Sequence, residues 1–371
     1  MATDTPPRLR SLDIFRGATI ASMILVNNPG SITTYAPLEH AAWHGWTFTD
    51  TVFPFFLWIV GVAMTLSTAR RVERGEDRGQ LLLHTFKRAA IIFLLGFLLG
   101  PFPNINWATI RIPGVLQRIA VCYLIAGVIF LFTKVRGQII AIVALNVVYW
   151  CLMTLYPTPG CGAGSLTIDC NFARYIDGLV IPGHMWSGTK VWDPEGIVST
   201  LPAISSVLFG ILTGHLLRHF SSSSDRLKWL AVQGSALVAG GYVLSIWMPF
   251  NKGLWTPPYA LLMAGLASLV FAVWYRVADM GGLARWFKPF EIFGTNAILM
   301  FLLSGTFAKF MSRTKITDGD TVVSLHGWFY RHVCLALAEP VNASLLYALM
   351  NVAVLFLVAY ALYRKRWFLK F

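Results

Sequence analysis

One connection between two apolar segments gathers several groups that could move a proton. The stretch 26–61 contains no lysine or arginine, and within it Glu39 and His40 are adjacent and Asp50 follows ten residues later. An imidazole can accept a proton near neutral pH, and a carboxylate can fix its tautomer. The residues therefore favour general-base chemistry centred on His40. A solvated interfacial histidine is the simpler alternative, and His44 is a competing base.

Two asparagines, Asn27 and Asn28, end the first apolar segment and precede Pro29 and Gly30. Asparagine, proline and glycine all suit the end of a helix, which is the structural interpretation. The functional interpretation is an amide that holds a carbonyl or an oxyanion, as in acyl transfer. The residues alone leave both interpretations open.

Polar side chains also occur inside apolar segments, where they are costly. A charge at the centre of a membrane helix costs at least about 2.5–3.5 kcal/mol on insertion scales, so such residues are usually functional or paired. Arg118 is functional, or its side chain extends to the membrane surface. Asn296 links helices or lines a pocket. Lys87 and Arg88 open a further segment, where they either anchor it at the membrane surface or bind the phosphates of an anionic cofactor.

The elements that position these groups are predicted to be membrane helices. Of the 371 residues, 56% are hydrophobic and 13% charged, and the mean hydropathy is +0.62. Soluble domains average about 45–50% apolar and about 25% charged residues, and a membrane helix needs about 20 apolar residues. We therefore expect an all-α polytopic membrane protein with one domain over 1–371 and about ten transmembrane helices. The segment 323–339 would add a re-entrant or interfacial helix. The ten expected spans are 12–29, 52–69, 86–101, 113–133, 138–156, 199–218, 227–248, 257–275, 289–310 and 342–363.

The distribution of positive charge predicts the orientation of these spans. The net charge of +13 would suggest nucleic acid in a soluble protein, but here the basic residues lie between apolar segments. Alternate connections and the two tails hold 21 of the 30 lysines and arginines, and the opposite connections hold eight. Cytoplasmic segments carry such an excess. We expect the lipid bilayer and no nucleic acid as a partner, both termini in the cytoplasm, no cleaved signal peptide, and His40 at the outer face.

The longest connection, about 157–198, lies on the expected outer side and contains Cys161 and Cys170. An oxidising compartment permits a disulfide between them. No zinc-type arrangement of histidines and cysteines surrounds them, so we expect no metal. The connection ends in Asp193-Pro194-Glu195-Gly196, which favours a helix start because aspartate suits the N-cap and proline the first helical position.

Several blocks of the chain, in this order, resemble the heparan-α-glucosaminide N-acetyltransferase family, a lysosomal membrane enzyme and its bacterial relatives. The resemblance covers nearly the whole chain. The blocks are R-L-R-S-L-D-I-F-R-G (8–17), V-N-N (26–28), H-A-A-W-H-G-W-T-F-T-D-T-V-F-P-F-F-L-W-I-V-G (40–61), R-I-P-G-V-L-Q-R (111–118), R-Y-I-D (174–177), D-P-E-G (193–196) and Y-R-K-R-W-F-L-K (363–370).

The resemblance implies a CoA-dependent N-acetyltransferase. Such an enzyme moves an acetyl group from cytosolic acetyl-CoA across the membrane to the amine of a terminal glucosamine. The family's active histidine falls on His40 and its asparagine on Asn28, while Asp50 matches an acidic position. The residues expected to line the passage for CoA and the acceptor are Lys87, Arg88, Arg111, Arg118 and Asn296.

The acceptor contacts are expected at Glu39, Trp43 and His44. The family's A-W-N-G becomes Ala42-Trp43-His44-Gly45 here, so an extra histidine lies beside the site. The resemblance also implies a bacterial inner-membrane protein. It leaves the acceptor, an acetyl-histidine intermediate and a homodimer open. The alternatives are a transporter of a sugar or lipid-linked saccharide, and an acyltransferase for another envelope glycan.

Overall fold

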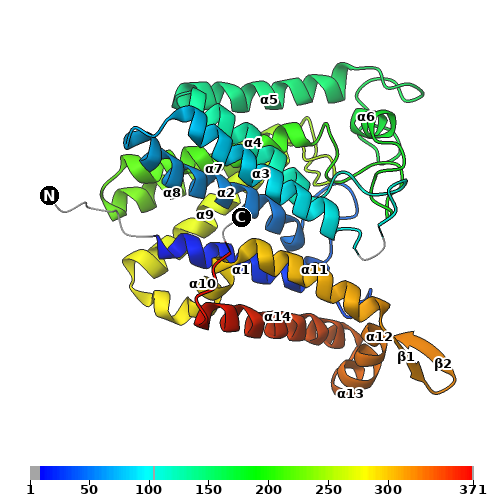
Figure 1. Ribbon diagram of the computed structural model, residues 1–371. Coiled ribbons are helices and arrows are strands. Elements are labelled where there is room, and N and C mark those ends of the chain that lie inside the picture. Colours follow the sequence, from blue (N-terminus) through cyan, green and yellow to red (C-terminus); the bar gives the residue numbers. More distant parts are fainter. Residues whose placement is uncertain (1–8, 103–104, 370–371) are drawn as a thin grey trace. The chain divides into compact units, whose positions relative to one another are not determined.

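A computed structural model describes residues 9–102 and 105–369, which are mostly helical (Figure 1). The four shorter helical turns are η1 (Ala36–Leu38), η2 (Tyr275–Met280), η3 (Leu283–Phe287) and η4 (Tyr330–Cys334). Strands β1 (Lys315–Asp318) and β2 (Thr321–Ser324) form an antiparallel hairpin. The α-helices are α1 (Arg10–Asn27), α2 (Phe48–Glu73), α3 (Arg78–Leu99), α4 (Val115–Phe132), α5 (Val135–Leu155), α6 (Phe172–Val180), α7 (Thr200–His219), α8 (Ser223–Leu244), α9 (Pro257–Trp274), α10 (Lys288–Thr295), α11 (Ala297–Arg313), α12 (Leu325–Phe329), α13 (Leu335–Leu337) and α14 (Pro340–Arg364).

The all-α polytopic class is confirmed. Within the described ranges, eight helical elements are long and apolar enough to cross a membrane, namely α2, α3, α4, α5, α7, α8, α9 continued by η2, and α14. A ninth crossing results if η3–α10 and α11, bent by 73°, form one span. The first expected span is a helix, but α1 carries Arg10, Asp13 and Arg16 within 18 residues and is not among the eight. The segment 323–339 contains the end of β2 and one continuous helical stretch, formed by α12, η4 and α13 over 325–337, which is too short to cross.

The chain groups into two compact units, each described by itself. The first contains the residues up to His40, Thr47–Val52 and the residues from Val270 to the end of the described chain. The second contains Ala41–Trp46 and Phe53–Leu269. The division falls inside the His40 loop, by which we mean residues 28–47, and again inside α2.

Glycines set the helix contacts within the first unit. A Cβ on Gly17 of α1 would lie 1.6 Å from the carbonyl oxygen of Phe290 in α10. On the facing helix, a Cβ on Gly294 would lie 2.3 Å from the carbonyl oxygen of Asp13. Only glycine allows two backbones this close, as is common between membrane helices. The contact fixes α1, which leads into the His40 loop.

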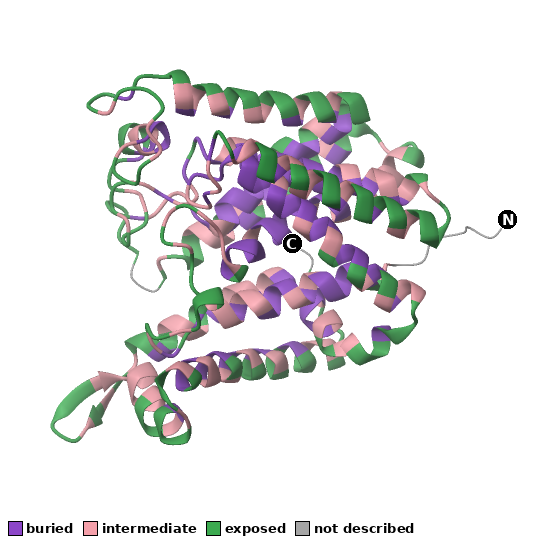
Figure 2. Ribbon diagram, turned by 180° about the vertical axis from the view of Figure 1, so that it is seen from behind, coloured by how far each residue is buried: buried purple, intermediate pink, exposed green. Residues whose placement is uncertain are grey.

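In the second unit, α2 and α7 make a close glycine contact of the same kind. A Cβ on Gly61 would lie 2.0 Å from the carbonyl oxygen of Val207, and one on Gly210 would lie 2.0 Å from that of Trp58. These two helices are the most buried of the eight, with 67% and 72% of their apolar windows covered, whereas α5 and α8 reach only 22% and 17% (Figure 2). The rest of the described protein therefore leaves most of the surface of α5 and α8 uncovered.

Candidate active site

The first turn of α2 carries a carboxylate that holds the imidazole of His40. Nδ1 of His40 lies 2.6 Å from Oδ1 of Asp50. The Asp50 side chain is 1% exposed, whereas that of His40 is 55% exposed. A buried carboxylate on Nδ1 fixes the ring and favours the tautomer with the proton on that nitrogen. The accessible part of the pair is therefore the imidazole ring, and the carboxylate is its buried part.

The same carboxylate begins the helix. Oδ2 of Asp50 accepts a hydrogen bond from the backbone N–H of Thr47 at 3.0 Å. Asp50 is the third helical residue after Thr47, so this is the return bond of a capping box. The Thr47 hydroxyl lies within hydrogen-bonding distance of Oδ2 of Asp50 and of the carbonyl oxygen of Glu39. Local helix-capping chemistry thus orients the carboxylate before any ligand is present.

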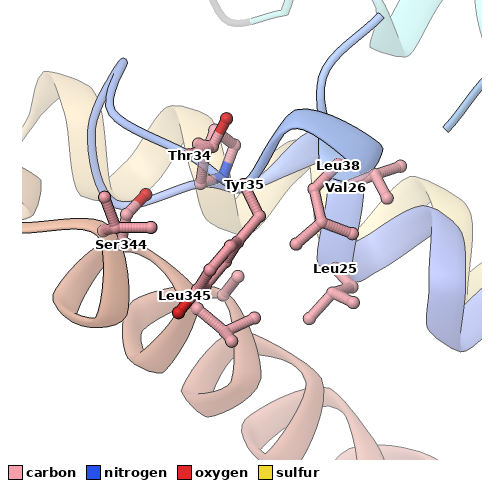
Figure 3. Close-up of a pocket in the computed structure, with 10 residues that line it drawn as sticks. Leu25, Val26, Thr34, Tyr35, Leu38, Ser344 and Leu345 are labelled. Carbon is pink, nitrogen blue, oxygen red and sulfur yellow. The ribbon is translucent and has the colours of Figure 1, made fainter. Parts of the chain in front are cut away.

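The loop before His40 is fastened to α14. Ser344 accepts hydrogen bonds from two backbone N–H groups, that of Gly30 through its carbonyl (3.2 Å) and that of Ser31 through its hydroxyl (3.1 Å). The hydroxyl of Tyr35 donates to Oδ1 of Asn342 at 2.5 Å. The pocket beneath this segment, between the end of α1 and α14, has a volume of about 10 Å³ (Figure 3). That is about the space of one water, so the pocket is too small for a sugar.

Asn28 is buried at the C-terminal end of α1, in the position expected of a helix cap. Its Nδ2 donates to the carbonyl oxygen of Ile24 at 2.7 Å and to Oγ of Ser304 in α11 at 3.0 Å. Both amide hydrogens are therefore used within the protein. The structural interpretation of Asn28 holds in this conformation, and a bond to a substrate carbonyl requires exchange of the Ser304 contact.

The three expected acceptor residues fall in different units. In the first unit, Glu39 accepts a hydrogen bond from Thr34 at 2.8 Å. In the second unit, Nε1 of Trp43 donates to the carbonyl oxygen of Leu166, and Nδ1 of His44 lies 3.3 Å from Nδ2 of the buried Asn251. Partial burial lowers the pKa of His44, so this imidazole is neutral at pH 7. His44 thus accepts a hydrogen bond from Asn251 through Nδ1.

Arg118 is fully inside the second unit, with 2% of its surface exposed. Its Nη2 donates to the carbonyl oxygen of Gly196 and to Oγ of Ser199, and the guanidinium lies 5.2 Å from the ring centroid of Trp255. Nε and Nη1 of Arg118 are buried and have no hydrogen-bond partner within the described residues. The side chain therefore ends against the connection that precedes α7 and not in solvent. The buried guanidinium retains two donors for a polar ligand.

Arg111 has its partners within the protein. Nε and Nη2 contact the two oxygens of Asp193 at 2.8 and 2.6 Å, and Nη2 also bonds Glu195. Burial alone would lower the pKa of Arg111, but the bonds and charges of the two carboxylates raise it. The side chain of Asp193 is 0% exposed. The guanidinium charge is therefore compensated, and this conformation does not present it to a phosphate.

The helix start predicted at Asp193 and Pro194 is wrong, because α7 begins at Thr200 with Ser199 as its N-cap. The turn instead wraps Asp177 of α6, which accepts hydrogen bonds from the backbone N–H groups of Ile197 (2.9 Å) and Asp193 (3.3 Å). Burial raises the pKa of Asp177 to about 6. The local sequence pattern suited a helix cap at Asp193, but Arg111, 82 residues earlier in the chain, binds the carboxylate of Asp193.

The remaining expected residues have separate positions. α3 begins at Arg78, so Lys87 and Arg88 lie in the middle of a helix and do not open it. Arg88 lies 5.3 Å from the ring centroid of Tyr123, and its buried Nε has no hydrogen-bond partner within the described residues. Asn296 lies at the break between α10 and α11, where Nδ2 donates to the carbonyl oxygen of Trp367 and Oδ1 accepts from the N–H of Leu369, each at 2.9 Å.

The long connection 157–198 contains the expected disulfide between Cys161 and Cys170. The other three cysteines are free, with Cys122 and Cys334 buried and Cys151 exposed. Asp177, Asp193 and Glu195 were not expected as site residues. One signal could have found them. The R-Y-I-D and D-P-E-G blocks contain these carboxylates, and the earlier block R-I-P-G-V-L-Q-R contains two arginines that could pair with them.

The fold and the site define an all-α polytopic membrane protein with a carboxylate-paired histidine at the start of a membrane helix. Residues 8–251 match a family model described as heparan-alpha-glucosaminide N-acetyltransferase, catalytic, and the chain belongs to this family.

Three curated relatives are similar along the chain. Heparan-alpha-glucosaminide N-acetyltransferase of Homo sapiens is 29% identical and that of Mus musculus 27%, each over 98% of this chain and 60% of the relative. An uncharacterized 39.9 kDa protein of Bacillus acidopullulyticus is 25% identical over 67% of this chain and 73% of its own length. The chain thus spans 60% of the length of the two named acetyltransferases.

Proposed function

We propose that this protein is a CoA-dependent N-acetyltransferase that moves an acetyl group from cytosolic acetyl-CoA to the amine of a terminal glucosamine-type sugar across the membrane. The observation that carries the proposal is the pair of His40 and Asp50 on the first turn of a membrane helix, in a chain of this family. Such a pair can take a proton from an attacking amine and hold the resulting imidazolium.

The reaction follows from the orientation of the ring. The sugar amine attacks the thioester carbonyl, a C–N bond forms, and Nε2 of His40 takes the amine proton. The C–S bond then breaks, and the departing CoA sulfur receives that proton from His40. Asp50 keeps Nδ1 engaged and stabilises the positive ring between the two steps. Asn28 would hold the carbonyl oxygen once Ser304 releases its amide. Direct transfer needs no acetyl-histidine intermediate.

The count of crossings supports an outer position of the His40 loop. Four candidate spans, α2 to α5, separate this loop from the connection with the Cys161–Cys170 disulfide. An even number of crossings brings both connections to one face, and disulfides persist on the oxidising side of a membrane. With α1 as a further crossing, both termini are cytoplasmic. We assign the protein to a bacterial inner membrane.

The polar groups without internal partners support the expected CoA contacts. Arg118 retains two buried donors, and Arg88 retains one. Together with Lys87 they are the expected contacts for the phosphates and carbonyls of acetyl-CoA, whereas Arg111 and Asn296 would act by holding the surrounding loops. Glu39, Trp43 and His44 are the expected acceptor contacts.

The test is His40→Ala in membrane vesicles supplied with acetyl-CoA on the cytoplasmic side and glucosamine on the other. We expect acetylated glucosamine to fall to background, while His332→Ala, a change at an exposed histidine of η4, keeps the wild-type rate. Equal turnover in His40→Ala removes this residue from the mechanism.

A sugar transporter is the second candidate, because the break between α10 and α11, with its 73° bend, is of the kind found at transporter binding sites. Sugar uptake that proceeds without acetyl-CoA, together with no binding of CoA to the purified protein, would favour the transporter.

A further inference from the structure

A groove of about 690 Å³ lies in the second unit between α5, α7 and α8, and none of the residues that line it has a role in the proposed reaction. Its volume is typical of a site for a small molecule. The first turns of α5, the last turns of α7 and the middle of α8 form its walls. The apolar lining consists of Val135, Ile139, Phe209, Leu212, Leu216, Phe220 and Leu237.

The groove opens among helices that face the bilayer. α5 and α8 each pack on α7, and most of their apolar surface remains uncovered (Figure 2). In a multi-pass membrane protein, such surface contacts lipid acyl chains. The apolar walls therefore suit a hydrocarbon chain that enters from the side.

Basic side chains surround one end of the groove. Arg218 and His219 line it directly, and Lys134 and Arg136 flank the lining residue Val135. Arg226 donates from Nε to the carbonyl oxygen of Phe220 at 2.7 Å, which fixes the rim. Arg218 bonds the exposed Glu73 through Nη2. Basic pockets between membrane helices bind anionic lipid headgroups.

Two polar side chains of the groove each have a partner within the protein. Nε2 of His215 lies 3.1 Å from Oε1 of Gln138, and Nε2 of Gln233 donates to Oγ1 of Thr213 at 2.8 Å. The pantetheine arm of CoA would bury its amides along the seven apolar lining residues, at a cost that an acyl chain does not have.

We propose that this groove binds an anionic glycerophospholipid. One acyl chain lies along Phe209, Leu212 and Leu216. The phosphate lies at Arg218 and His219, where it replaces the exposed carboxylate of Glu73 as the partner of Arg218. The occupant is distinct from both substrates of the proposed reaction, so the site is independent of that reaction.

The test is native mass spectrometry of the purified full chain, delipidated and titrated with dioleoyl phosphatidylglycerol or dioleoyl phosphatidylcholine. We expect one tightly bound phosphatidylglycerol and a weaker phosphatidylcholine. The double variant Arg218→Gln/His219→Gln should bind phosphatidylglycerol about tenfold more weakly, since each basic group near anionic lipid contributes a several-fold effect. Leu237→Trp, which fills the groove without changing charge, should lose the bound lipid.

Two matched variants control for folding and for charge. Val232→Trp adds the same ring to an exposed position of α8 outside the groove, and Arg74→Gln removes a charge from an exposed turn. Both should keep the wild-type lipid affinity and melting temperature. Any of three results would overturn the proposal: equal affinity for the two lipids, unchanged affinity for phosphatidylglycerol in Leu237→Trp, or displacement of the bound lipid by CoA.

Discussion

The carboxylate of Asp50 joins the ring of His40 to the first turn of α2, with one oxygen on Nδ1 of the ring and the other on the N–H of Thr47. The capping bond orients the carboxylate, and the carboxylate orients the imidazole. Because the helix itself fixes the carboxylate, the pair exists before acetyl-CoA or an acceptor arrives.

Replacement of Asp50 by asparagine should impair the proposed reaction without unfolding the protein. Asparagine can still accept the Thr47 bond, but it cannot stabilise an imidazolium and it favours the wrong ring tautomer. We expect kcat to fall by roughly 10²- to 10⁴-fold. The measurement is the initial rate of glucosamine acetylation, with Glu76→Gln as a carboxylate control. A rate within about twofold of wild type contradicts the role of Asp50.

Replacement of Arg111 separates two roles that the residue could have. Arg111→Met leaves the carboxylates of Asp193 and Glu195 buried without their cation, which typically costs about 3–5 kcal/mol. We expect a much lower melting temperature in detergent, with only partial recovery in Arg111→Lys because lysine lacks the bidentate geometry. An unchanged melting temperature with a raised KM for acetyl-CoA would instead assign Arg111 to the cofactor.

The raised pKa of Asp177 predicts a pH dependence of stability. The folded protein binds this proton more tightly than the unfolded chain, because burial moves the pKa from 3.8 to about 6. The stabilising contribution of this proton to the free energy of unfolding is fully present below pH 3.8 and is lost as the pH rises through about 6. The loss is up to about 3 kcal/mol.

Asp177→Asn, which is neutral at every pH, should flatten the fall in melting temperature between pH 4 and 7, even though the amide loses one of the two backbone hydrogen bonds. The exposed Asp169→Asn should keep the wild-type slope. Parallel curves for Asp177→Asn and the wild type would show that Asp177 does not titrate in this range.

The glycine contact between α2 and α7 should be intolerant of a single methyl group. Gly61→Ala or Gly210→Ala places a carbon about 2 Å from a backbone carbonyl oxygen, so the helices must separate. Overpacking costs typically 1–3 kcal/mol, and more when the neighbour is backbone. We expect poor yield and a lower melting temperature for both variants. Gly178→Ala, which meets nothing within 4 Å, should behave as wild type; similar stability in all three would refute the close contact.

The sequence predicted those features that depend on local composition. Long apolar runs identified eight of the ten expected crossings, and a ninth if η3–α10 and α11 form one span. The Cys161–Cys170 pair was expected from two cysteines in one long connection. A carboxylate close in sequence to His40 was expected to orient its ring, and Asp50 lies within hydrogen-bonding distance of it. These features need few contacts from distant parts of the chain.

The features that sequence reasoning missed depend on contacts between distant segments. The Asp193 turn has the pattern of a helix cap, and nothing nearby shows that Arg111 takes its carboxylate. Asn296 likewise meets the backbone of residues more than 70 positions later. α3 begins earlier than hydropathy suggested, because the side chain of Asp77 caps it by accepting a bond from the N–H of Gln80. Lys87 and Arg88 therefore lie in the middle of α3 and not at its predicted start.

The thiol chemistry of this chain bears on how its turnover can be measured. Released CoA carries a free sulfhydryl, whereas Cys122 and Cys334 are buried and Cys151 lies on the candidate span α5. Dithiothreitol, often added to protect CoA, would reduce the Cys161–Cys170 disulfide. A radiolabelled acetyl donor measures turnover without a thiol reagent and without the reductant.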